Sequence, residues 1–202
     1  MHKFIVLLTV ICFVPFSHAI VLKFNATLDG ASASPPNLSD AVGTADVWID
    51  QVANTMRVMS SFSGLWGITE AAHIHAATAV AGSGTAGVAT QVPNLPAFPL
   101  GVPSGSYDQT FDLTAISSYN PGFLTASGGT AAGAQAALTT ALSEGKTYLN
   151  IHTSFASDGE IRGFLKPESV PDTSSTALLL SLGLLGLFSL ISQSRKRKIE
   201  VR

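Results

Sequence analysis

Three histidines and one glutamate are the residues of this chain whose types could combine into a metal site. His73 and His75 stand two positions apart in the segment AHIHA. Because successive side chains of a β-strand point to opposite faces, these two imidazoles share one face, roughly 7 Å apart. His152 lies on a second alternating segment, YLNIHT, and Glu160 follows it after a turn. Imidazoles and carboxylates are ligands that zinc and copper take in proteins.

Two interpretations of these residues stay open at the level of sequence. In the first, His73, His75 and His152 bind one Cu or Zn ion, and Glu160 is a fourth ligand or supports a ligand. In the second, the imidazoles donate hydrogen bonds to backbone carbonyls or to Glu160 and serve the fold alone. Glu160 and Arg162 share a face at a period of two, which predicts a surface ion pair.

The elements that must position these residues are predicted to be strands. A turn at Asp158-Gly159 joins the segment of His152 to the segment of Arg162, and four prolines prevent regular structure between 91 and 104. The Ala/Leu-rich segment 133–144 predicts the one helix. This pattern predicts an all-β fold, an antiparallel β-sandwich of the immunoglobulin or superoxide dismutase kind. Other alternating, half-buried strands are predicted at 20–28, 45–50, 55–62 and 107–113.

The N-terminal end predicts export. Residues 1–19 combine Lys3, a short apolar run and the small residues that a signal peptidase reads, so they form a signal peptide cut after Ala19. A signal anchor that stays attached is the alternative. Cys12 lies in this segment and is the sole cysteine, so the mature domain at 20–169 has no disulfide and no thiol nucleophile.

The C-terminal end, residues 170–202, predicts sorting at a membrane. An apolar segment at 177–191, close to the ~20 residues that a membrane helix needs, precedes a basic tail at 195–202 that would stay in the cytoplasm. The sequence Val170-Pro171-Asp172-Thr173 before it resembles the VPDSG variant of the bacterial PEP-CTERM sorting signals. The resemblance implies cleavage by an exosortase-type membrane protease; an ordinary tail anchor is the alternative.

Charge excludes one class of partner. The predicted mature domain has five basic and eleven acidic side chains, a net charge of −6. Binding to nucleic acid depends on a basic surface, which this domain does not offer. No pair of catalytic carboxylates can be identified, so the sequence favours a protein that is not an enzyme. A hydrolase acting on exopolysaccharide is a third, weaker alternative.

Six short motifs follow one another along the chain. They are Phe24-x-Ala26-x-Leu28, Pro35-Pro36, Gly43-x-Ala45, Ala72-His73-Ile74-His75, Tyr148-Leu149-Asn150-Ile151-His152-Thr153 and Gly159-Glu160-Ile161-Arg162-Gly163. In this order they resemble the CHRD domain, a module named from chordin and common in exported bacterial proteins. The resemblance covers about 24 to 165, with Ala76 and Ala77 standing where the family usually has Gly-Pro. It implies an extracellular module that acts by binding, and it implies no established reaction.

The His-x-His pattern also resembles the copper-binding strand of Cu/Zn superoxide dismutase. Three histidines are too few for the two-metal site of that enzyme, which leaves a site for one Cu or Zn ion.

The favoured function is a noncatalytic module displayed at the bacterial cell surface or in the extracellular matrix. Its precursor would be anchored in the inner membrane by the C-terminal helix. It would bind exopolysaccharide or a surface protein, with Trp48 or Trp66 as a surface for sugars. The alternative is a metal-binding protein of the envelope that uses the three histidines.

Overall fold

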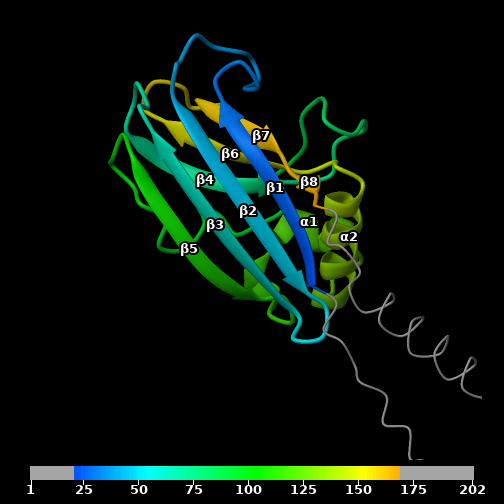
Figure 1. Ribbon diagram of the computed structural model, residues 1–202. Helices are drawn as coiled ribbons and strands as arrows, with labels where there is room; N and C mark the ends of the chain where they lie inside the picture. The colour runs from blue at the N-terminus through cyan, green and yellow to red at the C-terminus, as the bar shows by residue number, and fades with distance from the viewer. Residues whose placement is uncertain (1–20, 169–202) are drawn as a thin grey trace, which may run out of the picture. The chain divides into compact units, whose positions relative to one another are not determined.

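The computed structural model describes residues 21–168. The predicted signal peptide with Ala19 and the predicted sorting signal at 170–202 lie outside these residues. The described chain folds as one curled antiparallel sheet accompanied by two short α-helices, which confirms the all-β, sandwich-like prediction (Figure 1). No helix among residues 21–168 is long and apolar enough to cross a membrane.

Strand order in the sheet is β4-β6-β7-β1-β2-β3-β5, and β8 adds to β1. Every pairing between these strands is antiparallel. The strands are β1 (Val21–Asp29), β2 (Val42–Asp50), β3 (Thr55–Ser63), β4 (Thr69–His75), β5 (Gly105–Asp112), β6 (Tyr148–Thr153), β7 (Ile161–Phe164) and β8 (Lys166–Pro167).

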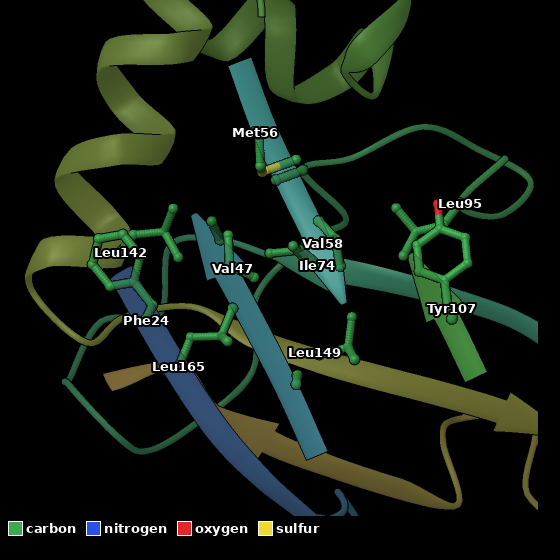
Figure 2. Packing of buried hydrophobic residues seen from close by; sticks show 14 of the residues in the cluster. Phe24, Val47, Met56, Val58, Ile74, Leu95, Tyr107, Leu142, Leu149 and Leu165 are labelled. Carbon is green, nitrogen blue, oxygen red and sulfur yellow. The ribbon is translucent and has the colours of Figure 1, made fainter. Parts of the chain in front are cut away.

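Alternation of apolar and polar residues decides which side of the sheet becomes the core. Val47 and Val58, which pair across β2 and β3, are fully buried, and Ile74 and Leu149 pair in the same way across β4 and β6. Figure 2 shows these side chains in one cluster. Each buried side chain of this size contributes about 1.5–3 kcal/mol to stability. The side chains between them are therefore directed to the opposite face of the sheet.

The prediction of one helix is wrong, because there are two. Helix α2 (Ala131–Ser143) is the predicted helix, begun about two residues earlier by the side chain of Thr130, which accepts a hydrogen bond from the backbone at Gly133. Helix α1 (Pro121–Ala126) was not predicted. Its start carries a recognisable signal, since the side chain of Asn120 caps the helix and proline occupies the first turn.

The proline-rich segment between β4 and β5 lacks strands, as predicted, but it covers the outer edge of β4. The backbone nitrogen of Leu95 donates to the carbonyl of Ala72 (3.0 Å). Thr69 donates to Val102 (3.0 Å) and accepts from Gly101 (2.8 Å) through its backbone. These bonds satisfy an edge that would otherwise be open for pairing with another chain. They also fix β4, the strand that carries two of the three histidines.

Candidate metal centre

Antiparallel pairing of β4 with β6 brings the three histidines onto one face of the sheet. His73 lies opposite Asn150, and Ala71 lies opposite His152. The ring centroid of His73 is 6.0 Å from that of His75 and 5.2 Å from that of His152. One ring nitrogen of each histidine lies within 4.8 Å of the other two. The shared face predicted from the alternation is thus confirmed.

Backbone carbonyls fix the protonation of all three rings. A carbonyl oxygen only accepts hydrogen bonds, so the ring nitrogen that faces it must carry the proton. The opposite nitrogen of each neutral ring then presents a lone pair. These lone pairs belong to Nδ1 of His73, Nε2 of His75 and Nε2 of His152. The bonds are His73 Nε2 to Pro93 (2.7 Å), His75 Nδ1 to Ala86 (2.9 Å) and His152 Nδ1 to Ser157 (2.7 Å).

Two of these lone pairs are buried without a hydrogen-bond partner in the described part of the chain, namely Nδ1 of His73 and Nε2 of His75. An unsatisfied buried polar atom costs about 1–3 kcal/mol. Nε2 of His152, which is less buried, has one long contact of 3.4 Å with the side-chain nitrogen of Asn150. The three ring nitrogens that are not bound to carbonyls therefore accept almost nothing from the described part of the protein.

Burial keeps His73 and His75 neutral. It lowers the pKa of His75 to about 4, although the bond to the Ala86 carbonyl acts in the opposite direction. Burial likewise lowers the pKa of His73, and the neighbouring His152 lowers it further. Neutral imidazole is the form that binds metal, so protons do not compete strongly for these two ligands at neutral pH.

Tyr148 and Arg162 form one wall of the centre. The ring of Tyr148 stacks on His75, with centroids 4.7 Å apart and planes at 10°. Arg162 lies over the ring of Tyr148, with its Cζ 4.8 Å from the ring centroid. The guanidinium donates to the carbonyls of Ser32 and Gly84, which hold it in place. A fixed positive charge therefore lies one aromatic ring away from a candidate ligand.

Glu160 lies away from the three nitrogens and belongs to a different cluster. Its side chain is fully buried, and its hydrogen bonds go to none of the imidazoles. The predicted surface ion pair with Arg162 is wrong, because the carboxylate is internal and its two oxygens are already bound. The donors are the backbone nitrogens of Trp66 (2.6 Å) and Gly67 (3.1 Å) and the hydroxyls of Ser39 (2.6 Å) and Thr153 (2.6 Å).

These four donors keep Glu160 ionised. Burial by itself raises the pKa of the carboxyl, but the hydrogen bonds outweigh burial and hold the pKa below its usual value. The sequence separates Glu160 from Ser39 by 121 residues and from Trp66 by 94. This carboxylate therefore joins two distant loops to the end of β6 and acts as a structural centre.

Comparison with known proteins agrees with this architecture. The model of the CHRD domain matches residues 24–165, well over half of the chain. The chain belongs to the CHRD domain family. No curated protein and no solved structure matches it. The matched part of this CHRD domain runs from β1 to the end of β7 and includes the three histidines and Glu160.

Sequence reasoning missed the groups that orient the imidazoles in this CHRD domain. The three carbonyls belong to Pro93, Ala86 and Ser157, which lie in irregular segments. Every residue type supplies a carbonyl, so no pattern of residue types could have indicated them. Asn150, by contrast, is placed on the face of His152 by the sequence pattern, because it alternates with Tyr148 and His152 along one strand.

Trp48 is not a free surface for sugars. Lys23 and Arg57 each place their charge 5.5 Å from the centroid of its ring system. Cations at this distance are attracted to an aromatic face and cover it. Of the two tryptophans that the sequence offered for this role, Trp66 is the one that stands exposed.

Proposed function

We propose that this CHRD domain is an exported, noncatalytic module that binds one Cu or Zn ion through His73, His75 and His152. The observation that carries the proposal is the clustering of three imidazoles, one nitrogen of each lying within 4.8 Å of the other two. Each ring is also anchored on a backbone carbonyl through one nitrogen, which leaves its second nitrogen free to bind. Carbonyls in this position are the usual support of metal-binding histidines. A Zn–N bond is ~2.0–2.1 Å long, so nitrogens that lie within 4.8 Å of one another would have to approach a common ion on binding.

Elemental analysis of the purified protein tests this function. The protein would be incubated with Zn²⁺ or Cu²⁺ and dialysed extensively before the metal is counted. We expect close to one ion per chain, lost in His73→Ala and in His152→Ala. The matched control is Asp108→Asn, which changes an exposed carboxylate and should retain the ion. Folded variants of both histidines that still hold one ion would contradict the proposal.

A second candidate function is binding of exopolysaccharide or a surface protein at Trp66. Its side chain is 53% exposed, and its indole nitrogen donates to the carboxylate of Asp40 (2.9 Å). Phe155 packs edge-on against the ring, with centroids 5.1 Å apart. The loop itself is tied to the buried Glu160. A rigid, exposed aromatic ring of this kind offers a face for stacking and costs little entropy on binding.

Binding to the producing cell's own exopolysaccharide distinguishes the two tryptophans. Trp66→Ala should lose retention on a column of the immobilised polymer, and Trp48→Ala, whose ring is already covered, should not. Equal retention of the wild type and Trp66→Ala would remove this candidate.

Export and sorting complete the proposal. We expect signal peptidase to cut after Ala19 and an exosortase-type protease to act near Val170-Pro171-Asp172, releasing the domain from its membrane-anchored precursor to the envelope, the surface or the medium. The resemblance of both ends to such signals supports this expectation. Mass spectrometry of the mature protein should find an N-terminus at Ile20 and no residues from 177 onward. A mature mass that retains the basic tail would exclude the cleavage.

A further inference from the structure

The ligands of the candidate metal centre are all neutral. In the described part of the chain, the group of ligand atoms close enough to share an ion consists of the three imidazole nitrogens alone. The carboxylate of Glu160 is not among them, because it accepts hydrogen bonds from four donors elsewhere. An ion bound here would therefore keep its full charge. The desolvation cost of an ion grows with the square of its charge, so a divalent ion pays about four times as much as a monovalent one.

The surroundings add a positive charge. Arg162 is 8% exposed and lies over Tyr148, whose other side stacks on His75. Among the described residues, the hydrogen bonds of the guanidinium go to two carbonyls, those of Ser32 and Gly84, and to no carboxylate. Its charge is thus held near the centre by carbonyls alone, although Asp29 lies opposite Arg162 on the neighbouring strand. Coulomb repulsion from this charge is twice as large for a divalent ion as for a monovalent one.

The number of nitrogens is one that Cu(I) accepts without a further ligand. On three imidazoles, Zn²⁺ completes its tetrahedron with a fourth ligand such as water, and Cu²⁺ prefers a tetragonal set. The planes of His73 and His75 meet at 84° and those of His73 and His152 at 68°, around one side of a sheet. Three such nitrogens form a three-coordinate set, which monovalent copper accepts without further ligands.

We propose that the three-histidine centre selects monovalent copper, Cu(I), over Cu²⁺ and Zn²⁺. The inference rests on the proposed metal-binding function and names the ion for which the centre is built. Neutral ligands, burial of His73 and His75, and the fixed charge of Arg162 all penalise the second positive charge of a divalent ion. A protein with this selectivity would hold copper in its reduced state outside the cytoplasm.

Competition for each ion tests the selectivity in the mature protein. Cu(I) would be titrated anaerobically against bathocuproine disulfonate, and Cu²⁺ and Zn²⁺ against chelators of known affinity. We expect a dissociation constant for Cu(I) at least tenfold below those for both divalent ions. Binding of Cu²⁺ or Zn²⁺ as tight as that of Cu(I) would overturn the inference and leave the proposed function standing. Binding of none of the three ions would overturn both.

A matched pair of substitutions isolates the effect of the Arg162 charge on metal selectivity. Arg162→Gln and Arg162→Lys both lose the two-armed contact with the carbonyls, but only Arg162→Gln loses the charge. We expect Arg162→Gln to reduce the ratio of Cu(I) to Cu²⁺ affinity at least fivefold and Arg162→Lys to preserve it. An equal change in both variants would contradict a role for the charge.

A carboxylate placed beside the ligands should reverse the preference. The side-chain nitrogen of Asn150 lies 3.4 Å from Nε2 of His152, so Asn150→Asp would add an anion at that distance. We expect this variant to bind Zn²⁺ and Cu²⁺ more tightly than Cu(I). An unchanged order of affinities in the folded variant would contradict the inference. If Asn150→Asp does not fold, the comparison of Arg162→Gln with Arg162→Lys still tests the inference.

Discussion

One polar cluster is centred on Glu160 and another on the three histidines, and they are built in opposite ways. Around Glu160, both carboxylate oxygens accept two hydrogen bonds each. In the histidine cluster, the three ring nitrogens that are not bound to carbonyls are acceptors, and two of them have no partner in the described residues. The first cluster is complete without any addition. The second presents lone pairs that only a cation or a donor can satisfy.

The difference separates a structural role from a binding role. A buried network whose every member is satisfied stabilises one arrangement of the chain. A buried set of unsatisfied lone pairs lowers the stability of the protein alone and gains free energy when an electron-pair acceptor binds. Glu160 therefore holds the loops of Ser39 and Trp66 to the hairpin of β6 and β7, whereas the three histidines carry the proposed metal site.

Removal of the Glu160 charge should have the largest effect. Glu160→Gln places an amide nitrogen among donors of hydrogen bonds, and breaking a buried charged network of this kind costs about 3–5 kcal/mol. Denaturant unfolding measures the loss. The control is Glu144→Gln, whose carboxylate is half exposed and paired with Lys146 at the surface, and which should change stability by less than about 1 kcal/mol. Equal effects of the two substitutions would remove the distinction between the clusters.

Acid should weaken the histidine cluster before it weakens the Glu160 cluster. The pKa of His75 is about 4 in the folded protein, below its ordinary value of 6.5. Between these two pH values the unfolded chain therefore binds more protons than the folded protein does. As the pH falls from 6.5 toward 4, the free energy of unfolding should decrease by roughly 3 kcal/mol in total.

Unfolding free energies measured from pH 7 to 4 in metal-free buffer test this window. In His75→Gln the free energy of unfolding should depend less steeply on pH, because the titrating imidazole has been removed. Glu160, whose pKa is lowered, contributes to the slope only at more acidic pH. Identical slopes in the wild type and His75→Gln would show that His75 titrates normally.

A bound ion should stabilise the protein through the histidines alone. At a free ion concentration 100 times the dissociation constant, linkage predicts a gain of about 2.7 kcal/mol. We expect this gain in the wild type and in folded Glu160→Gln, and not in His73→Gln. Loss of the gain in Glu160→Gln would mean that the two clusters form one functional unit. Thermal unfolding with and without the ion provides the measurement.

Truncation of Trp66 should have the smallest effect on stability. Glu160 binds the backbone nitrogen of Trp66, and the indole is 53% exposed. Trp66→Ala leaves that backbone bond in place, so we expect a loss of about 1 kcal/mol or less. A loss as large as that of Glu160→Gln would show that the indole, and not the carboxylate, secures the loop.

Much of the histidine cluster could be predicted because strand alternation is a local property. Ile74 and Leu149 had to face the core, so the neighbouring His73 and His75 had to face away from it. The hairpin turn at Asp158-Gly159 was equally visible.

The Glu160 cluster could not be predicted, because its partners lie far away in the sequence and two of them are backbone nitrogens. The alternation of side chains along a strand predicted that Glu160 and Arg162 share a face. Glu160, however, precedes β7 and does not follow the alternation of that strand. For the same reason, sequence could not show that loop carbonyls fix the proton on each imidazole.

The most direct test of this account is nitrogen-15 NMR of the imidazoles during titration with Zn²⁺, which is diamagnetic. Before addition, the proton should lie on Nε2 of His73 and on Nδ1 of His75 and of His152, as the carbonyl bonds require. Zn²⁺ should then shift the opposite nitrogen of each ring, in one step that saturates at one ion per chain. Protons on the facing nitrogens, or no response of these atoms to Zn²⁺, would show that the histidines are structural and that the account is wrong.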